Sequence, residues 1–331
     1  MNIEKLYETL AGQPKFRLKQ AKEAIFKDLI DDWAKATVLP LSLRQELNKE
    51  CPLKINNEFF VSKAKDSTKA LIRLEDGLKI ESVLLRHSDN RNTVCVSSQV
   101  GCPLNCSFCA TGKMGFKRNL EYFEIVEQVI FFARLLKKEN KRVSNIVFMG
   151  MGEPFLNYDN VLRAIKIINA EDGLNIGARH ISISTIGIIE GIKKLAKENL
   201  QINLAISLHA PNDKLRERIM PINKKYPIER VLQAVDDYMA KTKRKVMFEY
   251  LLINNVNDTL ECALELAKLM KKPLYFLNLI SYNPTGVFTA SPFKKIKEFK
   301  NILEKSGVNV AQRYRFGQDI GAACGQLAGK N

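Results

Sequence analysis

The chain has 331 residues, 46% of them hydrophobic, which is enough for one large domain with a smaller one and excludes a globally disordered protein. Its 52 Lys and Arg outnumber 36 Asp and Glu, leaving a net charge of +16. An excess of this size predicts a polyanionic partner, although a basic surface that serves only solubility would show the same excess.

The sequence shows no signal for export or membrane insertion. Its first residues, MNIEKLYETL, lack the basic and apolar regions of a signal peptide, and no apolar run approaches the roughly 18 residues of a membrane span. Seven cysteines, an odd number, favour a reducing compartment over a disulfide framework. We therefore expect a cytoplasmic protein with no membrane partner.

Residues 1–56 are predicted to form a small basic helical domain. Pro14 begins a helical segment with an apolar stripe that includes Ile25, and Pro40 precedes a second short helix. Most lysines of the first segment lie off this stripe. They would form either a solvated face or a face that contacts RNA, and the sequence leaves both interpretations open.

Residues 57–92 are predicted to be a β-rich connector, because their short, partly alternating runs are separated by Asp76-Gly77, a hairpin signal. In residues 93–331, strand and helix patterns alternate. The expected strands are 93–99, 145–149, 180–184, 202–208, 245–252 and 274–280, with a last one at 309–314, and the expected helices are 120–137, 158–169, 188–197, 228–241, 259–271 and 291–306. About six βα units without hairpin signals predict an α/β fold with parallel strands, whose ligands gather at the C-terminal strand ends.

Three cysteines, Cys102, Cys106 and Cys109, follow the first of these strands with the spacing C-x3-C-x2-C. A structural zinc site takes four protein ligands, and a bacterial ferredoxin run has C-x2-C-x2-C spacing with a fourth Cys nearby. Three thiolates can hold three irons of a 4Fe–4S cluster and leave the fourth iron open. We therefore predict one such cluster per chain, with a zinc knuckle or three unrelated thiols as the alternatives.

Polar and small residues recur where the later strands end. In MGMGEP, Gly152 allows close backbone approach and Glu153 offers a carboxylate to a cationic group. Hydroxyl, imidazole and amide groups suited to a ribose, a carboxylate and an adenine edge follow at three more strand ends: Ser184, the run Ser207-Leu208-His209, and Asn283. Each residue alone is more often an ordinary cap or turn residue, so their shared placement carries the prediction.

Two further cysteines, Cys95 and Cys324, draw attention for different reasons. Cys95 lies in the strand just before the cluster motif, and Cys324 lies in a Gly/Ala-rich tail where a thiol has little packing to do. Reactivity is therefore the expected role of Cys324. Cys51 and Cys262 are interpreted as structural.

Together, CVSSQVGC, CSFC, MGMGEP, SISTIG, SLHAP and AACGQLAG closely resemble the radical S-adenosylmethionine (SAM) RNA adenine methyltransferases. This family comprises a C2-methylating, dual-specificity type (RlmN) and a C8-methylating type (Cfr). The resemblance is close over residues 81–329 and looser before them. It implies a partial, TIM-like (β/α)6 radical SAM barrel, two SAM molecules per turnover, and SAM contacts from Gly152, Glu153, Ser184, Ser207, Leu208, His209 and Asn283.

The resemblance also implies a mechanism. Cys324 takes a methyl group from one SAM, and a radical made from a second SAM at the cluster activates that methyl group, which then adds to the adenine C2 carbon. Glu81 corresponds to the proton acceptor, and Cys95 attacks the sulfur of Cys324 to form a disulfide and release the RNA. The implied substrates are adenosine 2503 of 23S ribosomal RNA, in the peptidyl-transferase region, and adenosine 37 of transfer RNAs. A monomer with flavodoxin or ferredoxin as electron donor is expected.

Three other functions remain as alternatives. C8 methylation uses the same thiols, but Pro154 in GEP favours C2, because the C8 type has Ala at that place. A non-enzymatic iron–sulfur or zinc RNA-binding protein would carry no methyl group on Cys324. A radical SAM activase that makes glycyl radicals on a protein would explain neither the charge nor the pair of extra thiols.

Phosphate contacts are expected from three basic runs: Lys113, Lys117 and Arg118; Lys214, Arg216 and Arg218; and residues 241–245.

Overall fold

The computed structural model describes residues 1–329, and its N-terminal part is helical, as predicted. The elements are α1 (Ile3–Thr9), α2 (Lys15–Phe26), the 3-10 turn η1 (Trp33–Lys35) and α3 (Leu41–Glu50). Pro14 and Pro40 immediately precede α2 and α3, where a residue without an N–H costs no helical hydrogen bond. Trp33 is fully buried among these helices, and its ring N–H donates to the main-chain oxygen of Cys51 at 2.8 Å.

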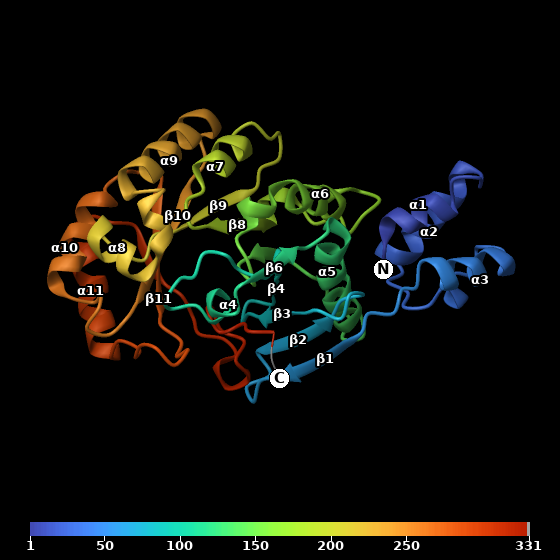
Figure 1. Cartoon of the computed structure of the whole chain (residues 1–331), viewed down its shortest axis with the longest axis horizontal. Helices are drawn as coiled ribbons and strands as arrows, with labels where there is room; N and C mark the ends of the chain where they lie inside the picture. The colour runs from blue at the N-terminus through green and yellow to red at the C-terminus, as the bar shows by residue number, and fades with distance from the viewer. Residues whose placement is uncertain (330–331) are drawn as a thin grey trace.

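These helices lie at one end of the molecule, next to α5 (Tyr122–Lys137) (Figure 1). Arg134 of α5 donates to the main-chain oxygens of Ile30 and Leu53, and Lys22 pairs with Asp172 at 2.8 Å. Burial lowers the pKa of Arg134 to about 10, and its partners are neutral carbonyls. The small helical part is therefore held on the core by specific polar contacts as well as by apolar packing.

One ten-stranded sheet runs through the rest of the chain in the order β1-β2-β3-β4-β7-β8-β9-β10-β11-β12. The strands are β1 (Asn57–Val61), β2 (Ser67–Arg73), β3 (Lys79–Arg86), β4 (Asn92–Cys95), β7 (Asn145–Phe148), β8 (Ile181–Thr185), β9 (Asn203–Ser207), β10 (Val246–Leu252), β11 (Tyr275–Ser281) and β12 (Val310–Gln312). The first four pair antiparallel, and every pair from β4 onward is parallel. This confirms the predicted α/β fold with a partial (β/α)6 barrel, to which β12 adds a seventh parallel strand.

Helices on the outer face of the sheet connect the parallel strands (Figure 1). After α5 they are α6 (Tyr158–Asn169), α7 (Ile189–Leu195), α8 (Asp213–Ile219), α9 (Ile228–Thr242), α10 (Leu260–Leu269) and α11 (Phe293–Lys305), with 3-10 turns η2 (Pro154–Asn157), η3 (Ala178–His180), η4 (Pro221–Lys224) and η5 (Gln318–Ile320). Helix α8 was not predicted, because its mostly charged sequence has too few apolar residues to show a helical period. No helix that the structure describes is long and apolar enough to cross a membrane.

The cluster motif lies in a small excursion from the sheet that the sequence did not reveal. The strand expected at 93–99 ends at Cys95, and the chain then forms a two-stranded antiparallel hairpin, with a short helix inside it. Its elements are β5 (Gln99–Gly101), α4 (Ala110–Lys113) and β6 (Phe116–Asn119). Gly101 has φ 76°, and a side chain there would meet the main-chain oxygen of Gly115 at 1.9 Å. The hairpin can close only because position 101 is a glycine.

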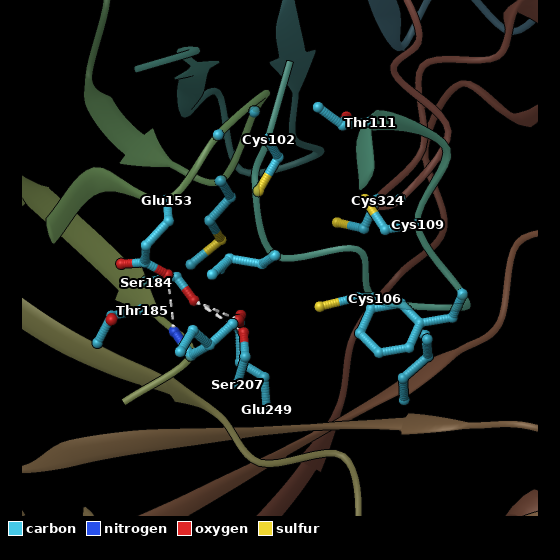
Figure 2. Close-up of a pocket in the computed structure, with 18 of the residues that line it drawn as sticks. Cys102, Cys106, Cys109, Thr111, Glu153, Ser184, Thr185, Ser207, Glu249 and Cys324 are labelled. Carbon is cyan, nitrogen blue, oxygen red and sulfur yellow. Dashed lines mark hydrogen bonds between the residues drawn. The ribbon is translucent and has the colours of Figure 1, made fainter. Parts of the chain in front are cut away.

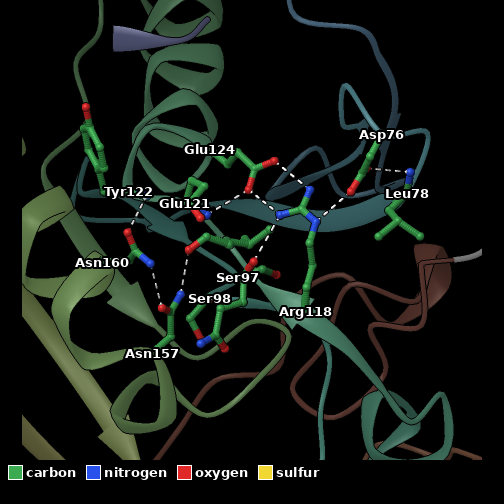
Figure 3. Close-up of polar contacts among 12 residues, drawn as sticks. Asp76, Leu78, Ser97, Ser98, Arg118, Glu121, Tyr122, Glu124, Asn157 and Asn160 are labelled. Carbon is green, nitrogen blue, oxygen red and sulfur yellow. Dashed lines mark hydrogen bonds and ion pairs between the residues drawn. The ribbon is translucent and has the colours of Figure 1, made fainter. Parts of the chain in front are cut away.

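Two polar groups fix this excursion to the core (Figure 3). Arg118 of β6 donates to both carboxylate oxygens of Glu124 at 2.7 and 2.8 Å and to Asp76 at 2.6 Å. Asn157 donates to the main-chain oxygens of Ser98 and Leu120 at 2.8 and 2.7 Å. Both carboxylates pair with Arg118, so its first task is to hold the hairpin, and its contact with RNA phosphate stays a prediction.

Candidate active site

The three motif cysteines, Cys102, Cys106 and Cys109, line one cavity of about 150 Å³ at the C-terminal ends of the parallel strands (Figure 2). Burial raises the pKa of Cys102 to about 12 and that of Cys106 well above its ordinary value, so both hold their protons near neutral pH, and a metal that binds them would displace those protons. Within residues 1–329, no three His, Cys, Asp or Glu side chains are arranged around a single metal ion. Thiols that share a cavity but no common point fit a cluster, in which each thiolate binds a different iron.

Glu153 supplies a buried carboxylate to the same cavity, with only main-chain and hydroxyl donors around it. Its two oxygens accept from the N–H groups of Phe155 at 3.1 Å and Ile186 at 2.9 Å. Burial raises its pKa to about 7. Gly152, beside it, has φ 95°, and a side chain there would meet Gln99 at 2.5 Å. A buried carboxylate of this kind fits a cationic ligand group such as the amino group of SAM.

Glu249 of β10 connects the predicted SAM-binding strand ends (Figure 2). Its carboxylate accepts from Ser184 at 2.7 Å, and the hydroxyl of Ser184 lies 3.3 Å from that of Ser207. Its main-chain oxygen accepts from the N–H groups of Leu208 and His209. Glu249 therefore sets the positions of three neighbouring strand ends at once.

His209 is held as a neutral ring with a defined tautomer. Its Nδ1 accepts from the N–H of Leu251 at 3.1 Å, which places the ring proton on Nε2. Burial, with a smaller contribution from Arg216, lowers its pKa to about 3. The ring packs edge-to-face on Phe108, with centroids 5.0 Å apart. His209 can therefore act as a hydrogen-bond donor but not as a cation near neutral pH.

Arg216 of α8 is fully buried, so the prediction that it contacts phosphate is wrong. The guanidinium makes five hydrogen bonds, to the main-chain oxygens of Ile186, Ser207, Leu208 and Tyr226 and to the side chain of Asn223. Three of those oxygens belong to the ends of β8 and β9 or the residues just after them, beneath the cavity. One buried cation thus gathers the main chain that carries the predicted SAM contacts.

Cys324 stands out among the seven cysteines, all of which the structure describes and none of which forms a disulfide. It is the one cysteine classed as exposed, and the space that it faces belongs to two cavities inside the barrel. The protein around these cavities desolvates the thiol and raises its pKa. Cys51 is buried directly after α3 and Cys262 is buried in α10, in keeping with a structural role. The tail around Cys324 is fixed by hydrogen bonds from Ala110 to Gly325 at 2.8 Å and from Thr111 to Leu327 at 2.6 Å.

A second cavity of about 630 Å³ occupies the barrel interior beside the first. Cys95 lines it, and burial raises the pKa of that thiol to about 12. Four residues line both cavities: Met149, Ile280, Cys324 and Leu327. Cys324 is thus the one thiol that faces both the cluster cysteines and Cys95.

Arg313, just after β12, lies in the wall of the second cavity and is a charged partner for the site. Its guanidinium donates to Glu249 at 3.1 Å. Its positive charge opposes the effect of burial on the pKa of both Cys95 and Cys324. The Glu249–Arg313 pair therefore joins the strand ends predicted to bind SAM to the segment that leads to the tail around Cys324.

Three predicted site residues occupy less direct positions. The side chain of Leu208 is buried and lines neither cavity. Asn283 lines the second cavity and donates to the main-chain oxygen of Cys324 at 3.2 Å. Glu81 lines neither cavity, and its carboxylate pairs with Lys69 at 2.9 Å and accepts from the tail N–H of Ala328 at 2.7 Å. The roles of these residues toward SAM and as proton acceptor stay predictions.

Sequence reasoning overlooked Glu249, Arg313 and the buried state of Arg216. Glu249 had a usable signal, because it is the single charged residue inside the otherwise apolar strand VMFEYLL. Arg313 and Arg216 lie in basic stretches where each resembles its solvent-exposed neighbours. No local pattern separates them from surface cations.

A partial (β/α)6 barrel with a three-cysteine loop at its strand ends defines a radical SAM enzyme, and residues 96–269 match the Radical SAM superfamily. The chain is 48% identical over 318 residues to the "probable dual-specificity RNA methyltransferase RlmN" of Dictyoglomus thermophilum, covering 96% of this chain and 91% of that protein. It is 45% identical to the "ribosomal RNA large subunit methyltransferase N" of Nitrosopumilus maritimus, with 96% and 93% covered.

The crystal structure of a radical SAM methyltransferase from Sphaerobacter thermophilus superposes with a TM-score of 0.95 at 42% identity, over 100% of this chain and 98% of that one. The chain belongs to the RlmN family of dual-specificity RNA methyltransferases. It is accordingly a SAM-dependent methyltransferase that uses a 4Fe–4S cluster, which Cys102, Cys106 and Cys109 are placed to hold.

Proposed function

We propose that this enzyme methylates the C2 carbon of adenine in RNA, with Cys324 as methyl carrier and Cys95 as the thiol that releases the product. The observation that supports this most directly is the position of Cys324, which lines both the cluster cavity and the second cavity. A methyl carrier must meet its donor on one side and its acceptor on the other. No other cysteine of the chain faces both cavities.

The chain's own residues have distinct tasks in this proposal. When bound, the cluster and a second SAM would supply a radical that abstracts hydrogen from the methyl group on Cys324, because an electron-poor C2 carbon needs a carbon radical as its attacking group. Glu153 binds the amino group of SAM, and Ser184 and Ser207 orient the rest of the molecule. Cys324 attacks the SAM methyl carbon as a thiolate, so the methyl–sulfonium bond breaks and its electron pair stays on the departing sulfur. Arg313 favours that thiolate.

Release requires a second thiol and a base. Addition of the radical carbon on Cys324 to C2 leaves one unpaired electron on the adduct. A base removes the C2 proton, and that electron would pass to the cluster when it is bound, which leaves a closed-shell thioether. Cys95 then attacks the sulfur of Cys324. The S–C bond breaks, its electrons pass to the adenine-bound carbon, which takes up a proton to become methyl, and a disulfide forms. We propose Glu81 as the base. Its contact with the N–H of Ala328 places it against the catalytic tail.

The proposed substrates are adenosine 2503 of 23S ribosomal RNA and adenosine 37 of transfer RNAs, in the cytoplasm, with flavodoxin or ferredoxin as electron donor and a monomeric enzyme. The names of the relatives and the net charge of +16 support an RNA substrate. The test is mass mapping of methyladenosine in both RNAs from cells with and without the gene. Loss of 2-methyladenosine supports the proposal, whereas loss of 8-methyladenosine alone assigns the C8 reaction instead.

A further inference from the structure

The mouth of the second cavity is built from two segments that are distant in the sequence. His87 and Arg91 come from the turn between β3 and β4, and residues 314–316 follow β12. Their rings form one row, since His87 and Phe316 have centroids 5.0 Å apart and Phe316 and Tyr314 4.8 Å apart, both edge-to-face. We call His87, Arg91, Tyr314, Arg315 and Phe316 the rim.

The rim exposes an aromatic ring and two guanidinium groups that have few contacts within the protein. Tyr314 is 69% exposed, one of the most exposed large side chains of the structure. Arg315 is also exposed and forms no ion pair with any residue in 1–329. Arg91 pairs only with Asp89 of its own turn, at 2.7 Å, and both side chains are more than half exposed. A row of rings that is exposed at Tyr314 and partly buried at His87 and Phe316, flanked by weakly paired arginines, is suited to a stacked base and its phosphates.

The cavity behind the rim leads to the reacting thiols. Its volume of about 630 Å³ is within the roughly 300–1,000 Å³ of small-ligand pockets, and Cys95 and Cys324 lie in its wall. A base inside a stack cannot reach a buried sulfur, so enzymes that modify bases take them out of the stack into such a pocket. A protein partner would explain the exposed ring of Tyr314 but not a cavity that continues to both thiols.

We propose that the rim receives unpaired RNA, stacking a base on the Tyr314–Phe316–His87 row and contacting flanking phosphates through Arg315 and Arg91, while the target adenosine enters the second cavity. The inference rests on the proposed function and extends it by assigning the RNA entrance. It concerns residues that have no part in the cluster cavity. The net charge of +16 favours a polyanionic partner, and the rim offers it two arginines.

The test compares rim variants with matched variants elsewhere. Tyr314→Ala and Arg315→Gln change the rim, whereas Phe293→Ala removes a ring that is 74% exposed on α11 and Lys268→Gln removes an exposed charge on α10. Tyr314→Ala should raise the KM for RNA about 5- to 150-fold, as expected for one lost stacking contact, and Tyr314→Phe should restore it. Arg315→Gln should lower the log–log salt slope of RNA binding by about 1.

Methylation of Cys324 by SAM, measured by mass spectrometry without RNA, separates this inference from the proposed function. If the unaltered enzyme never becomes methylated on Cys324, the proposed function fails. If it does, and both rim variants match their controls in KM and salt slope, only the rim assignment is overturned. Normal kinetics on protein-free RNA with a loss confined to ribosomal particles would also overturn it, by assigning the rim to a protein contact.

Discussion

Arg313 and Glu249 form an ion pair, 3.1 Å long, between the two cavities of the barrel. Glu249 is buried in β10 and holds Ser184 with its second oxygen, at 2.7 Å. Arg313 begins the segment that leads to Cys324, the proposed methyl carrier. The two halves of the proposed reaction, donor binding and methyl transfer, are thus joined by one buried carboxylate.

Glu249→Gln should weaken both SAM binding and the fold. The amide can still accept from Ser184, but it leaves Arg313 without a counter-charge, so we expect a loss of about 2 kcal/mol in the free energy of unfolding, discounted because Arg313 is one-third exposed. Denaturant unfolding and SAM titration check this. Glu261→Gln removes an exposed carboxylate on α10 and should leave the free energy of unfolding nearly unchanged.

Cys106→Ala should remove the broad iron–sulfur absorbance and abolish SAM cleavage, because two remaining thiolates cannot hold three irons of the cluster. Cys262→Ala is the matched control, since that thiol is buried in α10 away from both cavities. Absorbance and 5′-deoxyadenosine formation are measured on both. A Cys106 variant that kept both signals would contradict the assignment of the cluster ligands.

The two reactive thiols should separate cleanly by mutation. Cys324→Ala should form neither methylated enzyme nor RNA adduct. Cys95→Ala should still accept the methyl group and add it to adenine, but it should then stall, because no other thiol is placed to attack the sulfur of Cys324. Denaturing gels of enzyme with RNA should show a conjugate with the Cys95 variant alone. A conjugate with the Cys324 variant alone would reverse the two roles.

Arg216→Met should destabilise the protein by about 3 kcal/mol or more, because the main-chain oxygens of Ile186, Ser207, Leu208 and Tyr226 would lose a buried donor. Arg218→Met, two residues along α8 and exposed, is the control and should have little effect. Chemical denaturation compares the two. Equal effects would show that burial of the Arg216 guanidinium contributes little to the fold.

SAM binding should depend on pH through Glu153. Burial raises its pKa from 4.5 to about 7, so the empty site holds a proton below that pH, and the cationic amino group of SAM needs the carboxylate. The dissociation constant for SAM should therefore fall as pH rises through about 7. Glu153→Gln should bind weakly at every pH. A constant affinity between about pH 6 and 8 would argue against this carboxylate as the amino-group ligand.

The raised pKa of Glu153 also makes the free energy of unfolding depend on pH. A group whose pKa is higher in the folded state holds its proton more tightly there, so its contribution is present at low pH and is lost as pH rises from about 4.5 to 7. The change amounts to about 3 kcal/mol for one group. In protein without SAM, Glu153→Gln should remove this fall in unfolding free energy. SAM should offset it in the unaltered enzyme.

The sequence by itself determined the features that local spacing encodes. The predicted cluster ligands Cys102, Cys106 and Cys109 lie within one loop, and the βα units follow from hydrophobic periodicity and the positions of turns and prolines. Family resemblance added roles for Cys95 and Cys324, although nothing in the spacing of two thiols so far apart shows that they meet.

Only the tertiary structure decided which distant groups share a cavity and which charges leave the solvent. Arg216 and Arg218 lie two residues apart in one charged helix, yet one is fully buried and the other exposed, because helical rotation turns their side chains to different faces. Glu249 lies in β10 and Arg313 directly follows β12, and the order of strands in the sheet brings them together. Cys324 faces both cavities for the same reason: the chain after β12 returns across the open side of the barrel, which no local pattern encodes.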